Sequence, residues 1–395
     1  MLIKYISQLA LLQFIIAIFI WFFLFYFLER YLKSRYHLDF SSIKFFTIYY
    51  ILLSIVAIIR VFLDILPTTI DSFLYLSIAK EIEGIKDFQF FGSYVYGDII
   101  YIIKTLTFNN YYTILFLNNI IFIIALVNLM AIISSSTRRG YWIWFGFLLV
   151  YPSTYWFIPN IIRESIFIYF TVKILMQSIF IIRDRITIKQ LGLLLFYCSF
   201  SVMLRPQTLP IIFIWLIFVF VRKHFTYGIL VMLVGLLFLN QDYVQQEIIQ
   251  KVSFEYIEAF KTESSSSSSS MSLIAFKEQI IPSNLMELLT LSPYLTFRFL
   301  FSPFPWELSN LKYTFAFVDA LLMIIMFILL GWMAIKGLVL NWDVVLFSFL
   351  FIVIIGVFEI AFTGAVRHRM PYILTLSSLL LKIPSKKCDT VEQLL

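Results

Sequence analysis

Four arginines share one setting, because each stands in a short polar segment between long apolar runs. They are Arg163 in 159–164, Arg205 in 205–208, and Arg367 and Arg369 in 364–370. The planar guanidinium group matches two phosphate oxygens at once, so arginines gathered at one membrane face would bind a lipid-linked phosphate or diphosphate. Each arginine also has a structural alternative, a carboxylate partner or a carbonyl at a helix end, and Arg205 fits the second. Together the three segments favour anion binding.

Asp71 is the acidic residue best placed for proton transfer. It follows Thr68 and Thr69 just after the second apolar run. A carboxylate at the membrane surface can accept the proton of a sugar hydroxyl, which is the role of a general base. The alternative is structural, because Asp71 and Ser72 stand where a helix is expected to begin and would make a good N-cap. The two roles compete for the same oxygens.

Arg367 and Arg369 are two residues apart in front of Pro371. In an extended segment, side chains at that spacing point the same way, so both would face one diphosphate while His368 turns away. Glu359, inside the preceding apolar run, is a functional candidate because a membrane-embedded carboxylate is costly. An ion pair between Glu359 and one of the two arginines is the alternative.

Tyr75, Glu164, Arg298, Glu359 and His368 are secondary candidates. Glu164 starts an apolar run, where the helix dipole favours a carboxylate. No group of His and Cys has the spacing of a zinc site, and the chain has no nucleotide-binding phosphate loop. We therefore predict no cofactor, while a divalent metal held by outer carboxylates stays open.

The elements that position these residues are predicted to be membrane helices. The 395-residue chain is 61% hydrophobic and 13% charged, with a mean hydropathy of +0.93. Soluble domains are nearer half apolar and a quarter charged, so a soluble enzyme is excluded. Continuous apolar runs such as 14–28 also exclude a membrane barrel, whose strands alternate. The net charge of +7 is explained by Lys and Arg in cytoplasmic loops, and no nucleic-acid partner is predicted.

Eleven apolar stretches predict an all-α bundle of about 11 transmembrane helices, forming one membrane domain over residues 1–395. They are 9–28, 45–63, 112–133, 141–158, 165–182, 190–204, 209–221, 228–239, 313–335, 344–362 and 372–381. Lys and Arg gather on alternate loops, which assigns those loops to the cytoplasm. The C-terminus is then cytoplasmic and the N-terminus outside.

Two long outer regions, 64–110 and 240–312, hold most of the polar length. A stripe of aliphatic residues in the first predicts an amphipathic helix along the membrane surface. The stripe is Leu74, Ile78, Ile82 and Ile85. The second region contains a run of serines, 264–270, which we interpret as a tolerated loop expansion rather than a lid.

Short segments across the chain resemble the motifs of a known group of enzymes. Asp71-Ser-Phe-Leu-Tyr75, after an early span, resembles the first-loop acidic motif of the GT-C membrane glycosyltransferases. Pro159-Asn-Ile-Ile-Arg163-Glu164-Ser165 and Val366-Arg367-His368-Arg369-Met370-Pro371 resemble bacterial members of that group. They also resemble the polytopic O-antigen and exopolysaccharide polymerases.

The resemblance implies a transferase that takes sugar from a polyprenyl phosphate or diphosphate at the outer face of the bacterial cytoplasmic membrane. The glycan acceptor would receive either one sugar or a whole repeat unit in cell-surface polysaccharide synthesis. The resemblance implies that Asp71 is the catalytic base. It also implies that the lipid phosphate is bound by Arg163, Arg205, Arg367 and Arg369. The first-loop motif departs from the family in having one Asp without an acidic neighbour.

Two other classes of function stay open. Charged residues inside apolar runs can line the path of a transporter or of a flippase for lipid-linked glycans. These residues are Arg60, Lys173, Asp319 and Glu359. A transporter needs polar access from both sides, whereas both long polar regions here are assigned to one side, which favours the transferase. In a non-catalytic membrane scaffold, the outer arginines would be individually replaceable.

Overall fold

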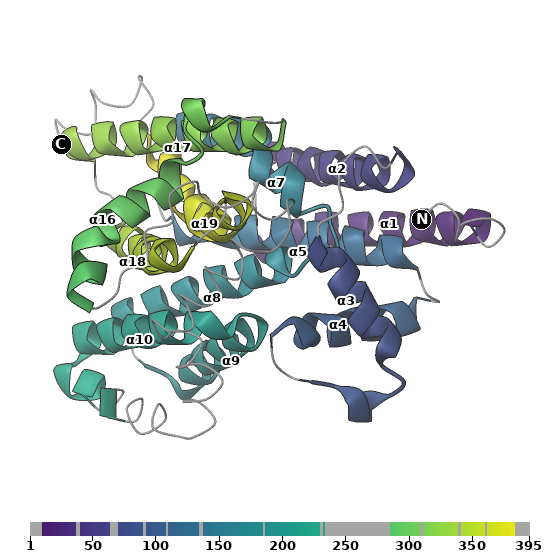
Figure 1. The fold of residues 1–395 in the computed structure, drawn as a ribbon, viewed down its shortest axis with the longest axis horizontal. Helices are drawn as coiled ribbons and strands as arrows, with labels where there is room; N and C mark the ends of the chain where they lie inside the picture. Colours follow the sequence, from purple (N-terminus) through teal and green to yellow (C-terminus); the bar gives the residue numbers. More distant parts are fainter. Residues whose placement is uncertain are drawn as a thin grey trace. The chain divides into compact units, whose positions relative to one another are not determined.

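The structure is a computed structural model, and the residues it describes form helices and the turns between them (Figure 1). It describes 10–36, 40–63, 70–89, 92–107, 110–133, 137–184, 186–229, 232–233, 285–308, 311–338, 341–359 and 362–383. The all-helical class predicted from the sequence is confirmed over these residues. The serine run 264–270, most of the stretch 228–239 and the first part of the second outer region lie outside them.

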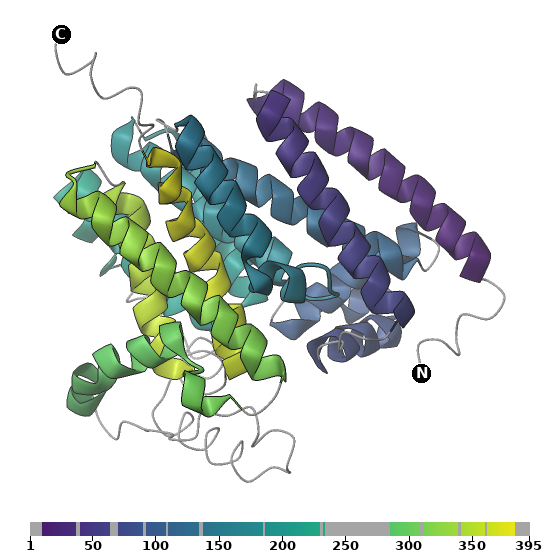
Figure 2. The same cartoon turned by 90° about the horizontal axis from the view of Figure 1, so that it is seen from above.

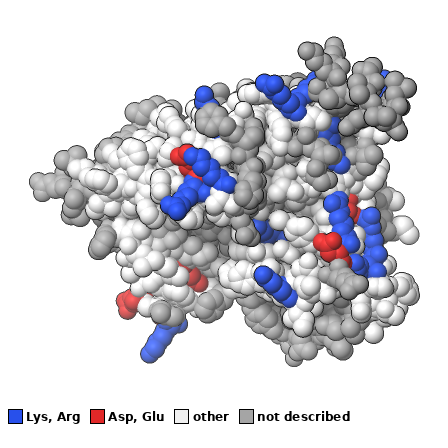
Figure 3. Space-filling view, turned by 180° about the vertical axis from the view of Figure 1, so that it is seen from behind, with Lys and Arg blue, Asp and Glu red and all other residues white. Residues whose placement is uncertain are grey.

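Among the residues that the structure describes, six helices are long and apolar enough to cross a membrane, as in a multi-pass membrane protein. They contain Ile15–Ser34, Ser41–Arg60, Tyr112–Ile132, Glu164–Arg183, Pro206–Lys223 and Tyr313–Ile335. Ile188–Leu204 and Trp342–Val357 are apolar but shorter. The predicted number of about 11 spans is not confirmed. On the face shown in Figure 3, charged side chains are few and most of the described surface is uncharged.

The chain divides into two compact units, where the sequence predicts a single domain. The first consists of Met1–Ala131, Thr154–Val172 and Met203–Arg205. The second consists of Ile132–Ser153, Lys173–Val202 and Pro206–Leu395. Helices α7, α8 and α9 contribute residues to both units, which are described separately.

The first unit is built mainly from five helices and the beginning of a sixth. They are α1 (Ala10–Tyr36), α2 (Phe40–Leu63), α3 (Ile70–Glu81), α4 (Ser93–Leu106), α5 (Tyr111–Ile132) and the start of α8 (Glu164–Arg183), with a short 3-10 turn η2 (Ile85–Asp87). Helices α1 and α2 lie side by side (Figure 2), where Trp21 stacks on Tyr50 with ring centroids 5.9 Å apart. Aromatic stacking of this kind adds to the burial of apolar area.

Helices α3 and α4 form a closely packed pair in the first outer region. Gly92 has φ 65°, a left-handed conformation that suits glycine, and α4 begins at the next residue. A Cβ on Gly97 would lie 2.4 Å from Ile78 Cγ2, so glycine allows the two helices to approach. A helix, α3, lies where the stripe predicted one, but it ends at Glu81, before Ile82 and Ile85, and the predicted buried face is partly wrong. Tyr75 is buried against α4, whereas Leu74 is 45% exposed.

The second unit contains the remaining helices. They are α6 (Arg138–Val150), most of α9 (Ile188–Leu204), α10 (Leu209–Lys223), α16 (Leu285–Phe301), α17 (Leu311–Ile335), α18 (Trp342–Phe358) and α19 (Phe362–Ser377), with the 3-10 turns η3 (Pro206–Thr208), η5 (Pro305–Glu307) and η6 (Ser378–Lys382). Trp144 Nε1 donates to Ser377 Oγ at 3.1 Å and joins α6 to the end of α19. Gly356 of α18 allows close contact with Phe299 of α16, 3.1 Å from the position a Cβ would take.

Two predicted boundaries in the C-terminal and central parts are wrong. The apolar stretch 141–158 is interrupted, because α6 ends at Val150 and Pro152 begins the short helix α7 (Pro152–Phe157). Proline has no N–H for an intrahelical bond, so it starts a helix more readily than it continues one. The expected loop 364–370 is helical instead, since α19 runs from Phe362 through Pro371 to Ser377.

Candidate functional site

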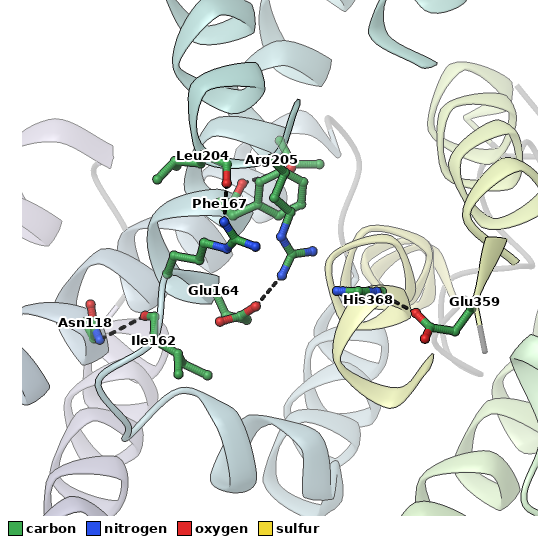
Figure 4. Close-up of polar contacts among 10 residues, drawn as sticks. Asn118, Ile162, Glu164, Phe167, Leu204, Arg205, Glu359 and His368 are labelled. Carbon is green, nitrogen blue, oxygen red and sulfur yellow. Dashed lines mark hydrogen bonds and ion pairs between the residues drawn. The ribbon is translucent and has the colours of Figure 1, made fainter. Parts of the chain in front are cut away.

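The first unit places buried Arg205 and half-buried Arg163 near one carboxylate, that of Glu164. Arg163 ends the segment between α7 and α8, Glu164 is the first residue of α8, and Arg205 follows the end of α9. Arg205 Nη2 donates to Glu164 Oε1 in an ion pair whose members are 2% and 0% exposed. Figure 4 shows this pair with Phe167, over whose ring the Arg205 guanidinium lies 4.3 Å from the centroid. This ion pair places Arg205 beside the residue that follows Arg163.

Arg163 contacts different partners from Arg205. Its Nη1 donates to the backbone oxygen of Leu204 at 2.5 Å, at the C-terminal end of α9. Its guanidinium carbon lies 6.0 Å from the centroid of the Tyr75 ring. Arg163, Glu164 and Arg205 form a cluster that we call the arginine pair. Because it has two guanidinium groups and one carboxylate, the cluster carries a net positive charge.

Helix α3 carries Asp71 towards this cluster. Ser72 Oγ donates to Asn160 Oδ1 at 3.0 Å, which joins the first turn of α3 to the segment that holds Arg163. Asp71 and Tyr75 are four residues apart, so they share one face of the helix, with Cβ atoms about 5–6 Å apart. Since Arg163 lies against Tyr75, half-buried Asp71 stands one helical turn from the residue of α3 that Arg163 contacts.

A network of neutral polar side chains supports the segment 159–163. Asn118 of α5 donates through Nδ2 to the backbone oxygens of Asn160 at 2.7 Å and Ile162 at 3.3 Å, the second of which is drawn in Figure 4. The same amide nitrogen donates to the Tyr96 hydroxyl at 3.0 Å. No role was predicted for these residues. The only sequence signal was the occurrence of asparagine within or beside apolar runs.

The electrostatic environment of Tyr75 follows from its position. Burial raises the pKa of its hydroxyl, and the positive charge of Arg163 lowers that pKa in part. Its ring meets that of Tyr96 edge to face, with centroids 4.9 Å apart. Tyr75 therefore stays neutral at ordinary pH and presents an aromatic face to a guanidinium group.

The second unit contains Arg369 in a different environment. Arg369 is 0% exposed, and its Nε and Nη2 donate to Asp319 Oδ2 at 3.2 and 2.8 Å. Its Nη1 donates to the backbone oxygens of Phe299, Leu300 and Ser302 at 2.8, 2.6 and 3.3 Å. Asp319 also accepts a hydrogen bond from Ser153. These contacts bind the C-terminal end of α16 to α17 and α19, and they occupy every nitrogen of the side chain.

The expectation that Arg367 and Arg369 point the same way is wrong. Both lie in helix α19, where residues two apart are rotated by about 200°. Glu359 contacts His368, a pairing that the sequence did not predict. His368 Nδ1 lies 2.6 Å from Glu359 Oε2 (Figure 4), and Gly364 makes room for that carboxylate. His368 is therefore oriented by Glu359.

Arg298 has a local partner in the second unit. Its Nη2 lies 3.5 Å from Glu307 Oε1, while Glu307 Oε2 accepts the backbone N–H of Phe304 at 2.8 Å. The pair therefore stabilises the turn that follows α16. Phosphate binding by Arg163, Arg205, Arg367 and Arg369 stays a prediction, as does a site role for Arg298.

The part of the chain that the structure describes contains no group of three or more His, Cys, Asp or Glu side chains able to hold a metal ion. The comparisons with known proteins assign no class. No family model, curated protein or solved structure matches the chain. What can be said of function therefore rests on the side chains described above.

Proposed function

We propose that this protein is a bacterial membrane glycosyltransferase that uses a sugar linked to polyprenyl phosphate or diphosphate. The observation that supports this proposal is the net positive arginine pair beside the face of α3 that carries Asp71. Guanidinium groups bind phosphate oxygens, and a carboxylate can accept the proton of a hydroxyl. The proposed base therefore stands one helical turn from Tyr75, the residue of α3 against which Arg163 lies.

The reaction has three concerted parts. Asp71 takes the proton of an acceptor hydroxyl, and the acceptor oxygen forms a bond to the anomeric carbon of the donor sugar. The bond between that carbon and the phosphate oxygen breaks, and the electron pair leaves with the polyprenyl phosphate or diphosphate. Arg163 and Arg205 stabilise the negative charge that develops on the leaving group. Glu164 positions Arg205 through their ion pair.

The proposed setting is the outer face of the cytoplasmic membrane, with the N-terminus outside and the C-terminus in the cytoplasm. Apolar helices long enough to span a bilayer support a membrane location, and a polyprenyl chain would lie in lipid beside them. The product would be a cell-surface polysaccharide or its precursor, made by single transfer or by repeat-unit polymerisation.

Incubation of purified protein with a lipid-linked sugar and a glycan acceptor tests the proposal. The wild type should form product, and Asp71→Asn, which keeps the shape of the side chain but cannot take the proton, should lower turnover by about 10²–10⁴-fold. Asp87→Asn is the matched control, because Asp87 accepts from the backbone N–H groups of Glu83 and Gly84 in the turn after α3. Equal turnover in wild type and Asp71→Asn would exclude Asp71 as the base.

The contacts of the buried charges do not favour a transporter or flippase. Arg60 donates to the backbone oxygens of Trp156 and Tyr155, at 2.9 and 3.4 Å, and Asp319 is paired with Arg369. The backbone contacts hold the Arg60 guanidinium in place, and the charge of Asp319 is balanced by Arg369. Movement of lipid-linked glycan across vesicles without any transfer product would support the flippase instead.

A further inference from the structure

The side-chain amide of Asn160 has an orientation that its neighbours determine. Its Oδ1 accepts from Ser72 Oγ and from the backbone N–H of Ile161, both at 3.0 Å. A backbone N–H can only donate, so the atom that faces Ile161 must be the oxygen. The amide nitrogen, Nδ2, therefore points the other way, and the usual ambiguity between amide oxygen and nitrogen does not arise.

This nitrogen is a buried donor. Asn160 is 2% exposed, and no acceptor lies within hydrogen-bond distance of Nδ2 in the described part of the chain. Arg163, three residues further along, has a buried Nε that likewise has no acceptor in the described part of the chain. A buried donor that lacks an acceptor costs about 1–3 kcal/mol. Neither donor has an acceptor in the described part of the chain, so both are available to a ligand.

The surrounding network supports this orientation. Asn118 Nδ2 already donates to the backbone oxygens of Asn160 and Ile162, so it is a donor and cannot accept from Asn160. Ser72 holds Oδ1 from the side of α3, and the segment 159–163 is held by α5. The amide nitrogen is thus fixed in place before any ligand arrives.

We propose that Asn160 is a ligand-binding residue whose Nδ2 donates to a phosphoryl oxygen of the lipid-linked substrate, beside Arg163 Nε. This inference rests on the proposed function and adds a residue with a different chemistry from the arginines. A neutral amide donates along one direction, so it selects the position of one oxygen, whereas the guanidinium groups supply charge. Since Ser72 holds the amide and adjoins Asp71, the same contact aligns the phosphate with the proposed base.

Binding measurements separate this role from a structural one. Protein in phosphatidylcholine nanodiscs would be titrated with decaprenyl phosphate and, as an uncharged probe, with decaprenol. Asn160→Asp keeps an oxygen that can accept from Ser72 and Ile161 but loses the amide donor. Asn160→Thr also keeps an oxygen and loses the amide donor, and it adds no charge. Both variants should raise the Kd for decaprenyl phosphate about tenfold or more, as expected for a lost hydrogen bond to a charged group, and leave decaprenol unchanged.

Two controls accompany these variants. Asn128→Thr alters another buried asparagine of the same unit, whose Nδ2 donates to the Ile124 backbone oxygen at 2.6 Å, and should leave the Kd unchanged. Ser72→Ala removes the hydroxyl that holds Oδ1 but keeps the donor, and should raise the Kd by less than the Asn160 variants do. If Asn160→Thr binds decaprenyl phosphate like the wild type, the inference is overturned.

A spectroscopic measurement on the wild type avoids any question of folding in the variants. Asparagine side chains labelled with ¹⁵N should show dipolar coupling to the ³¹P of bound decaprenyl phosphate. Bound phosphate with no such coupling would show that Nδ2 is satisfied by water alone and would overturn the inference while leaving the proposed function intact. A wild type that does not bind decaprenyl phosphate at all would overturn both.

Discussion

Arg163 and Arg369 are the same residue type in two different situations. Arg369, in the second unit, is fully buried, and each of its nitrogens has a protein acceptor. Arg163, in the first unit, uses one nitrogen on a backbone oxygen while its Nε has no acceptor in the described part of the chain. Asp319 balances the charge of Arg369, whereas Glu164 forms its ion pair with Arg205.

This difference suggests how structural arginines can be told from ligand-binding ones. A guanidinium group whose charge and hydrogen bonds are all satisfied stabilises the fold, and removal of either partner leaves a buried charge. A guanidinium group with excess charge and an unused donor is costly to the fold, which is typical of a site that a ligand completes. The comparison predicts opposite outcomes for the same substitution in the two units.

The largest expected effect is on Arg369. Arg369→Ala should destabilise the protein by about 3–5 kcal/mol, because it strands Asp319 in the interior and leaves three backbone oxygens at the end of α16 without a donor. Folded yield by size-exclusion chromatography and the midpoint of thermal unfolding measure this loss. The double variant Arg369→Met with Asp319→Leu should recover much of the yield. A well-folded Arg369→Ala protein with low turnover would instead place Arg369 in the active site.

Arg163→Ala should have the reverse signature. We expect near-normal folded yield with turnover lowered about ten- to a hundredfold, because a charge-assisted contact worth about 1.5–3 kcal/mol is lost in the transition state. Arg163→Lys should recover only part of the rate, since an ammonium group cannot bind two oxygens as a fork. Steady-state turnover on protein matched for folded fraction is the measurement, and unchanged turnover in Arg163→Ala would refute the comparison.

Gly97→Ala tests whether the position of α3 matters to the arginine pair. The new Cβ would clash with Ile78, so we expect a loss of about 1–3 kcal/mol of stability and lower turnover, although no charged residue is changed. Combination with Ile78→Leu, which lacks the Cγ2 branch, should relieve part of the loss in a double-mutant cycle. Gly146→Ala in α6 is the control, because no atom lies within 4 Å of its added Cβ. Equal effects of the two alanine substitutions would contradict the close approach of α3 and α4.

The smallest expected effect concerns Asp98 of α4, a buried carboxylate with no ion pair among the described residues. Burial raises its pKa, and the backbone amide of Gln89 lowers it in part. The folded protein therefore keeps this proton at pH values where the unfolded chain has released it. Stability contributed by Asp98 should fall as pH rises above about 3.9, the ordinary aspartate pKa, and stay lower once the folded pKa is passed.

Asp98→Asn removes this penalty. The variant should melt at a higher temperature than the wild type at pH 7 and at the same temperature near pH 3, as measured by thermal unfolding across that range. A lower melting temperature at pH 7 would show that the charged form of Asp98 has a favourable contact, as Glu164 and Asp319 have with their arginines.

The sequence by itself determined the class of the fold and the residue types of the candidate site. Long apolar runs can satisfy their backbone groups in lipid only by forming helices, so the all-helical prediction followed from composition. The helix that begins near Asp71 was predicted from local patterns, whereas the partners of Arg163 and Arg205 were not. Amphipathic spacing identified α3 but misjudged its buried face, because Tyr75 packs on α4 in place of Leu74.

Only the tertiary structure decided which arginines have partners. Asp319 and Arg369 are 50 residues apart and Ser72 and Asn160 are 88 apart, and no local spacing reports such contacts. The helical course of 362–377 was likewise unpredictable from Pro371, because packing against α16 to α18 stabilises a helix that proline alone would interrupt. Local chemistry sets what a side chain can do, whereas long-range packing decides which of its hydrogen bonds are already made.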